Sequence, residues 1–357
     1  MRMLPASLLC TAGLLAIGFP LHAAPSAANG APVYSVVRQY AIGGAGGWDY
    51  LVADPQSGHL FIARSDRALV VNLADGSLAT TIPGTAGIHG FAIVHELGRG
   101  YTSNGRADNL TVFDLATLKP TGTIAVSGHN PDAILYDQAS RHLFTFNGRS
   151  KDVSVIDPQT EKVVATIPAG GKPEFAVSDG KGRIFFNIED TGELAQIDSS
   201  NAKLVAKWKL EDCEDPSGLA FDEARHRLFS VCQNGRMVVT DSVSGKFVAS
   251  VAIGKGPDAA AYDAQRGFVF SSNGEDGTLT VVKQVDADHY RDVANVPTQP
   301  SARTLALDPQ SHLVYLVAAK FGPKPEPTKE QPHPRAPVLD GSFRVLVVGS
   351  DAGADRP

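Results

Sequence analysis

One phrase, repeated seven times, constrains this chain more than any single residue does. The phrase is a short apolar strand that ends in an acid, a polar turn, an aromatic-aliphatic strand, an Asn/Gly-rich turn and two more apolar strands. The residue that closes the first strand marks each repeat, at Asp54, His95, Asp137, Asp179, Asp222, Asp263 and Asp308. The marks are 41, 42, 42, 43, 41 and 45 residues apart. A period near 40 that contains four short strands is typical of propeller blades.

A second series of marks supports this interpretation, because the residue that ends the third strand repeats with the same period. This series is Asn72, Asp114, Asp157, Asp198, Asp241 and Lys283. The sequence therefore predicts an all-β fold, a seven-bladed β-propeller with four antiparallel strands per blade. We expect the Asn-Gly turns to be tight hairpin turns whose residues need positive φ.

The ends of the repeat region predict how the ring closes. Blade seven has only three strands after residue 297, whereas VYSVVRQYAIGG near the start of the chain resembles fourth strands such as KVVATIPAG. We expect residues 33–42 to complete blade seven, because closure removes the unpaired edges of an open ring. The single propeller domain is predicted to span 33–350, with a Pro-rich loop at 321–341 inside blade seven.

Segments outside the repeats predict the destination of the chain. Arg2, an apolar run and the small residues of LHAAPSAANG are typical of a signal peptide, predicted at 1–24. Residues 25–32 are expected to be a flexible N-terminus and 351–357 a disordered tail. No later stretch reaches the ~18 apolar residues of a membrane span. We expect an exported monomer in the periplasm or outside the cell.

Composition limits the partners of the chain. A net charge of −6 gives no basic footprint for general nucleic-acid binding. The content of 35 Gly and 23 Pro suits many short strands joined by turns.

Export would make the cysteines informative. Cys213 precedes the first strand of blade five and Cys232 ends its second strand, so the two should meet at one edge of the sheet. We predict a disulfide there. Two buried thiols and a soft metal pair are the competing interpretations.

A resemblance to a known family rests on one repeat in particular. The segment HLFTFNGRSKDVSVIDPQTEKVVATIPAG resembles the repeat of YVTN-type (YncE-like) β-propellers, with a strand, an Asn/Gly turn and a V-S-V-I-D strand. The resemblance covers about 33–350 and implies a WD40-like or quinoprotein-like scaffold more than a reaction. Blade one (RSDRALVVN) and blade four (NIEDTGELAQID) depart from the pattern.

Propeller topology sends two sets of loops to one face around the central channel, where ligand sites are expected. The candidate ligand-binding residues on these loops are Asp49, Arg64, His89, Arg106, His129, Asp132, Arg149, Glu174, Asp215, Arg236, Asp258 and Arg303. Arginines suit an anion, whereas carboxylates and imidazoles suit a divalent metal, for which His89, His129 and Glu174 are the candidates. The acids at the starts of the inner strands have an architectural alternative, since they could accept backbone N–H bonds.

These observations leave the function open between three classes. The first is a non-catalytic binding or scaffold module that presents its loop face to a protein, glycan or small ligand. The second is a metal-assisted lyase or lactonase in which His89, His129, Glu174, Asp215 and Asp258 hold the ion. The third is an accessory subunit of a periplasmic redox or metal-handling system. No catalytic residue follows from spacing, so the sequence favours a protein without catalysis, and a divalent metal is the one cofactor it suggests.

Overall fold

The structure is a computed structural model of the 357-residue chain, and it describes residues 1, 32–329, 332, 334 and 336–351. The chain divides into two units, Met1–Ala31 and Pro32–Pro357. The predicted signal peptide (apart from Met1), residues 25–31 and the tail from 352 onward lie outside the described residues. Every strand of the described residues belongs to the second unit.

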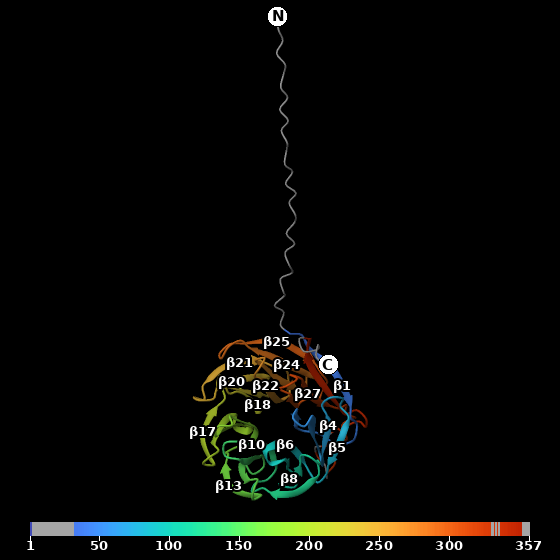
Figure 1. The fold of residues 1–357 in the computed structure, drawn as a ribbon, viewed down its shortest axis with the longest axis vertical. Coiled ribbons are helices and arrows are strands. Elements are labelled where there is room, and N and C mark those ends of the chain that lie inside the picture. The colour runs from blue at the N-terminus through green and yellow to red at the C-terminus, as the bar shows by residue number, and fades with distance from the viewer. Residues whose placement is uncertain (2–31, 330–331, 333, 335, 352–357) are drawn as a thin grey trace. The chain divides into compact units, whose positions relative to one another are not determined.

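The second unit contains seven antiparallel four-stranded sheets, which confirms the predicted fold (Figure 1). The first strands of the sheets are β2 (Leu51–Asp54), β6 (Ile88–Val94), β10 (Pro131–Asp137), β14 (Pro173–Ser178), β18 (Pro216–Asp222), β22 (Pro257–Asp263) and β26 (Leu305–Leu307). The second strands are β3 (His59–Arg64), β7 (Arg99–Asn104), β11 (His142–Asn147), β15 (Arg183–Ile188), β19 (Arg227–Cys232), β23 (Phe268–Asn273) and β27 (Val314–Ala318). The third strands are β4 (Arg67–Asn72), β8 (Asn109–Asp114), β12 (Asp152–Asp157), β16 (Glu193–Asp198), β20 (Arg236–Asp241), β24 (Thr278–Gln284) and β28 (Arg344–Ser350). The fourth strands are β5 (Leu78–Ile82), β9 (Pro120–Ala125), β13 (Lys162–Pro168), β17 (Lys203–Lys209), β21 (Phe247–Ala252), β25 (Tyr290–Pro297) and β1 (Tyr34–Ala41). Two short 3-10 helices, η1 (His95–Leu97) and η2 (Glu189–Thr191), interrupt turns.

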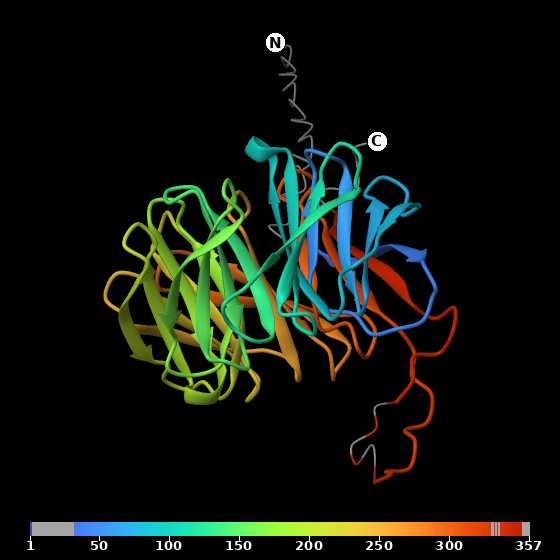
Figure 2. The ribbon, with the colours of Figure 1, turned by 90° about the horizontal axis from the view of Figure 1, so that it is seen from below.

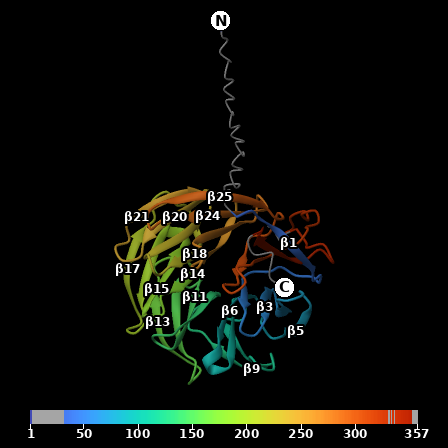
Figure 3. The ribbon, with the colours of Figure 1, turned by 45° about the horizontal axis from the view of Figure 1, so that its top comes forward.

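The sheets stand as blades around a central channel. First strands of neighbouring blades contact one another around the ring. Figures 2 and 3 show the blades arranged around the axis of the channel. The ring closes as predicted, since β1 pairs with β28 from Tyr34↔Ser350 to Ala41↔Arg344. The two ends of the domain therefore share one sheet, and β28 is not left as an unpaired outer edge.

Burial explains why the middle strands of each blade are nearly continuous apolar runs. Five of the six residues of β3 are buried, whereas the outer strand β17 alternates between exposed and half-buried positions. A blade packs against a neighbour on both faces, so its outermost strand is the most exposed of the four. Aromatic side chains fill the space between blades, as where Phe61 lies 5.8 Å from Phe91 and from Phe113, between ring centroids.

The acid that marks each repeat closes the turn after the first strand. Asp137 accepts hydrogen bonds from the backbone N–H of Ser140 at 2.9 Å, and Asp308 accepts one from Gln310 at 2.8 Å. In blade two the mark is His95, whose Nε2 lies 2.9 Å from Oδ1 of Asp54 in blade one. The mark is an architectural position in these blades.

The predicted Asn-Gly hairpin turn with positive φ is confirmed at Asn234-Gly235, where Gly235 has φ of 74°, but three other Asn-Gly pairs differ. Asn104, Asn147 and Asn273 are fully buried strand ends, and the residues with positive φ are Asp108, Lys151 and Gly277, four positions later. The Asn147 amide donates to Asp152 at 2.7 Å and to Ser154 at 2.8 Å across the hairpin. Each asparagine fastens a four-residue loop with its side chain, a use that turn statistics do not reveal.

Two further predictions can be compared with the described residues. Cys213 and Cys232 form a disulfide with their Cα atoms 5.3 Å apart, which confirms the predicted pair. Among the described residues no helix has the length and apolar character needed to cross a membrane.

Candidate ligand site at the channel mouth

One equivalent residue in every blade lies at the start of the inner strand. These seven residues, which we call the mouth ring, are Asp49, His89, Asp132, Glu174, Ser217, Asp258 and Arg303. In blades two to six the pairing between the first two strands shifts register at this residue, as between Pro131 and Ile134. A bulge of this kind re-aims a side chain, here away from the regular pleat.

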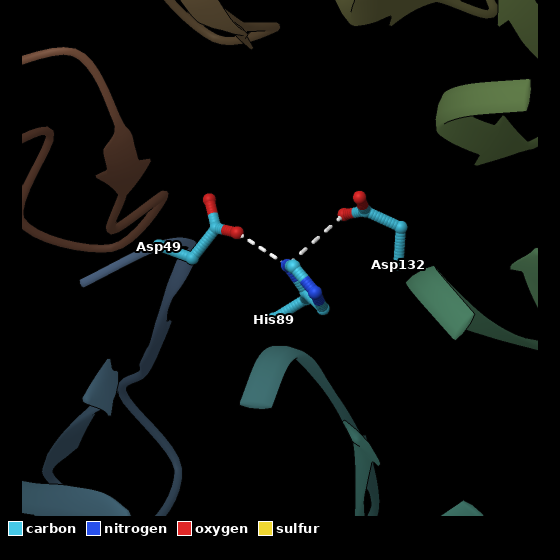
Figure 4. A group of neighbouring side chains, drawn as sticks. All are labelled: Asp49, His89 and Asp132. Carbon is cyan, nitrogen blue, oxygen red and sulfur yellow. Dashed lines mark hydrogen bonds and ion pairs between the residues drawn. The ribbon is translucent and has the colours of Figure 1, made fainter. Parts of the chain in front are cut away.

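Contacts link the mouth ring across blades. Arg303 pairs with Asp258 and lies 3.3 Å from Oδ1 of Asp49, which joins the last blade to the first. Asp49 in turn lies 2.6 Å from Nδ1 of His89, and the same nitrogen is 3.7 Å from Asp132 (Figure 4). The hydroxyl of Ser217 donates to Asp258 at 2.8 Å. Six of the seven blades are thereby connected through one line of polar contacts.

Electrostatics divides the ring into charged and neutralised groups. Burial disfavours the charged imidazole of His89, but the hydrogen bond to Asp49 and the charges of Asp132 and Asp49 outweigh it and raise its pKa to about 9. Burial raises the pKa of Asp132 to about 6, against the lowering effect of His89. Burial and the charge of Asp132 also raise the pKa of Glu174, although Lys172 lies 2.6 Å away. His89 is therefore an imidazolium at neutral pH, held between two carboxylates.

Tyr50 follows Asp49 and lies close enough to the four acids of the mouth ring to be affected by their charges. Its residue is 6% exposed, its ring packs on Phe175 at 5.1 Å between centroids, and its hydroxyl has no hydrogen-bond partner among the described residues. Burial and the surrounding acids, Asp132 first among them, raise the pKa of this phenol well above its usual range. The phenol of Tyr50 is therefore neutral at pH 7.

A cavity of about 320 Å³ opens beside His89, between blades one, two and three. Its lining includes one acid, Asp49, and four basic side chains, His89, Arg303, Arg106 and Arg149. Arg106 and Arg149 make no side-chain hydrogen bond or ion pair to any other described residue, although Arg149 contributes to lowering the pKa of Asp108. Both lie on the exposed face of the domain.

The position of Arg106 and Arg149 can be compared across the repeat, since each lies two residues after a second strand. The equivalents in chain order are Asp66, Arg106, Arg149, Asp190, Asn234, Glu275 and Lys320. The repeat does not require a cation at this position, because three blades have an acid there. Two guanidinium groups on adjacent blades are thus a departure from the repeat at the wall of a cavity.

Two glycines keep this wall compact. Gly87 has φ of 71°, and a Cβ there would lie 2.6 Å from Cβ of Arg106. A Cβ on Gly105 would lie 2.6 Å from Nε2 of His89. Any larger residue would push the arginine or the imidazole out of place.

Arg64 is predicted from the sequence to bind a ligand at the channel mouth, but it does not line the cavity. Its side chain is fully buried over the ring of Phe343, 3.8 Å from the ring centroid. Its guanidinium donates to the carbonyls of Gly44 at 2.7 Å, Ala45 at 3.0 Å and Gly46 at 2.5 Å. Arg64 therefore shapes the Gly-rich loop before blade one and does not reach the cavity.

Other predicted residues lie apart from the mouth. The exposed imidazole of His129 pairs with Asp108 at 2.8 Å, and Arg236 lies 3.4 Å from Asp212. Asp215 is exposed, with φ of 45°. Among the described residues the one group of His, Cys, Asp and Glu that could share a metal is Asp49, His89 and Asp132, whose ligand atoms lie within 4.8 Å of one another. Of the predicted metal set it contains His89 alone, without His129 or Glu174.

Sequence reasoning missed Lys172 and Tyr50. Lys172 binds Glu174 and Glu189 at the rim, and Tyr50 follows the ring residue Asp49. Aligning all seven inner-strand starts would have found Tyr50, because the other blades have Gly, Ala, Phe or Thr there.

Comparisons with known proteins leave the family open. No family model matches the chain, and no curated protein matches it. Among solved structures, hydrazine synthase of Kuenenia stuttgartiensis is similar with a TM-score of 0.68 and 15% identity, over 76% of this chain and 92% of that one. The WD40 repeats of RRP9 give 0.74 and 10%, over 89% and 99%, and U3-55K gives 0.73 and 10%, over 88% and 99%. At such low identity these likenesses show the propeller fold alone.

Proposed function

We propose that this protein is a binding module that takes a small anionic ligand, a carboxylate or phosphate, in the cavity beside His89. The observation that carries the proposal is the pair of unpartnered guanidinium groups, Arg106 and Arg149, on that cavity's wall. Arginine forks suit planar and tetrahedral oxyanions, and the imidazolium of His89 adds a third positive group. The nearest acid, Asp49, is already paired with His89 and Arg303.

Isothermal titration calorimetry with inorganic phosphate and with acetate tests this proposal. We expect Arg106→Gln and Arg149→Gln each to weaken binding about tenfold, because each removes a charge-assisted hydrogen bond. Arg236→Gln is the matched control, since it removes an arginine from the same face outside the cavity. Unchanged affinity in the double variant would contradict the proposal, as would the absence of binding by either anion.

A divalent cation at Asp49, His89 and Asp132 is a second candidate, favoured by the proximity of their ligand atoms. The ion would have to displace the proton that the raised pKa of His89 retains, so binding should strengthen toward pH 9. Such an ion could polarise a carbonyl group of a bound ligand, as in a metal-assisted lyase or lactonase. The melting temperature in EDTA, then with Ca²⁺, Mg²⁺, Zn²⁺ or Cu²⁺, tests it; no shift with any ion eliminates the candidate.

The destination of the chain is part of the proposal. The disulfide between Cys213 and Cys232 favours an oxidising compartment. With the signal-like residues 1–24, this supports export to the periplasm or beyond, and the V-S-V-I-D type of repeat supports a place among YVTN-type propellers. The mass of the protein recovered from cell fractions tests export, because uncleaved protein in the cytoplasm would argue against it.

A further inference from the structure

A second cavity adjoins the first. It has a volume of about 580 Å³ and shares Gly47, Trp48, Ser65 and Arg303 with the charged cavity. The rest of its wall is formed by Ala45 and Gly46 and by the Pro-rich loop of blade seven, which contributes Phe321, Ala336, Pro337 and Val338. The two cavities are thus one recess with a cationic end and an apolar end, and Trp48 lies on the boundary.

Hydrogen bonds hold the apolar wall in place. The two legs of the loop pair where Gly322 donates to the carbonyl of Pro337 at 2.8 Å and Leu339 donates to that of Lys320 at 2.8 Å. Phe321 also bridges to Val338 and packs 5.8 Å from Trp48 between ring centroids. Trp48 is fixed from behind by Phe343, 5.4 Å away. The apolar end is therefore built by paired backbone, not by isolated side chains.

The apolar end of the recess is exposed to solvent at Phe321. Phe321 is 47% exposed although it borders a recess lined by Trp48 and Val338. A ligand that covers this apolar surface removes it from water, which favours binding. A simple oxyanion would occupy only the cationic end.

We propose that the ligand of this site is an amphipathic anion, an organic acid whose charged group lies among Arg106, Arg149 and His89 while a ring-sized apolar group lies between Trp48 and the Pro-rich loop. This inference rests on the proposed anion site and names its ligand class. Charge complementarity selects the anionic group, and the apolar wall selects the rest of the molecule. An anion without an apolar group leaves the larger cavity unfilled.

Four probes on the full mature protein test the inference by calorimetry: acetate, phenylacetate, 2-naphthylacetate and the neutral 2-naphthylacetamide. We expect 2-naphthylacetate to bind roughly tenfold to hundredfold more tightly than acetate, because the ring system is transferred from water to an apolar wall. The amide should lose most of that affinity. Phenylacetate should lie between.

Matched variants in the same loop locate the apolar contact. Phe321→Ser should remove most of the gain in affinity from acetate to 2-naphthylacetate. Leu339→Ser should leave the gain intact, because Leu339 is similarly exposed, at 44%, but does not line the cavity. Equal affinity for acetate and 2-naphthylacetate, or equal effects of the two variants, would overturn the inference.

The same experiment separates the two proposals. If acetate binds through Arg106 and Arg149 without any gain from the ring, only the ligand class fails. If the amide binds as tightly as the acid, or if no anion binds, the anion site itself fails. The fluorescence of Trp48 is an independent measurement. The chain has two tryptophans, so Trp208→Phe leaves Trp48 as the only one, and phenylacetate should change its fluorescence.

Discussion

The two ends of one inner strand, β10, show how differently a buried carboxylate can be used. Asp137 at one end accepts hydrogen bonds from Ser140, Ser178 at 2.6 Å and Ser199 at 2.7 Å. The carboxylate of Asp132 at the other end accepts no hydrogen bond from the described residues, and the imidazole of His89 lies 3.7 Å from it. Burial acts to raise the pKa of both, but the serine hydrogen bonds lower that of Asp137 whereas Asp132 rises to about 6.

This contrast separates architecture from binding. A carboxylate whose acceptor sites are filled by its own protein stabilises the fold and has nothing left for a ligand. A carboxylate that is buried without such partners is unfavourable in its charged form, and a bound cation or hydrogen-bond donor would stabilise that form. Asp137, which marks a repeat, belongs to the first kind, and Asp132 of the mouth ring belongs to the second.

The largest expected difference is in stability. Asp137→Ala should lower the free energy of unfolding by about 3 kcal/mol, because it leaves three serine hydroxyls without their acceptor in a buried site. Asp132→Ala should cost less than about 1 kcal/mol, since it removes a carboxylate that burial disfavours. Urea unfolding of both variants at pH 7 measures the contrast, and equal losses would break it.

The pH dependence of stability should differ in sign at the two ends. The lowered pKa of Asp137 gives stability that is present above pH 4 and is lost as the pH falls below that range. The raised pKa of Asp132 gives stability that is present below pH 4 and is lost as the pH rises through about 6. Replacing Asp132 by Asn should therefore flatten the profile between pH 4 and 7, by up to about 3 kcal/mol.

Denaturant midpoints of the wild type and Asp132→Asn, taken across that range, supply the measurement. Asp66→Asn is a suitable control, because Asp66 is an exposed acid of the same face that pairs with Arg67. Parallel profiles for wild type and Asp132→Asn would show that Asp132 is not the group that titrates.

The charge of His89 should depend on Asp49. Asp49→Asn should lower the pKa of the imidazole from about 9 by one unit or more, because it removes the closest carboxylate. Imidazole resonances in an NMR titration with EDTA present report this change directly. An unmoved pKa would mean that Asp132 alone holds the proton.

The smallest effect is expected at Glu174. Burial raises its pKa, so at pH 7 Glu174→Gln replaces a protonated carboxyl by a group of the same shape and should change stability by less than about 0.5 kcal/mol. A large loss in thermal unfolding would instead identify a charged pair between Glu174 and Lys172. That result would move Glu174 to the architectural kind.

Repetition is the reason so much of the fold could be predicted from the sequence. The seven marks and the strand-like start at residues 33–42 predict the blades and their closure, and the position of Cys213 and Cys232 at one sheet edge predicts the disulfide. Interactions of this kind are local or repeat at a fixed period, so a linear pattern contains them. The buried role of Arg64 was invisible, because its partners are backbone carbonyls about 20 residues away.

The site belongs to the tertiary structure. The sequence by itself determined the blades, the closing strand and the set of polar residues that could face the channel. Only the folded ring decided that Asp49, His89 and Asp132 meet, that His129 lies apart, and that Arg106 and Arg149 share a cavity with Trp48. The physical reason is that each blade contributes one side chain from a strand start about 40 residues from the next, and the charge of each depends on neighbours from other blades.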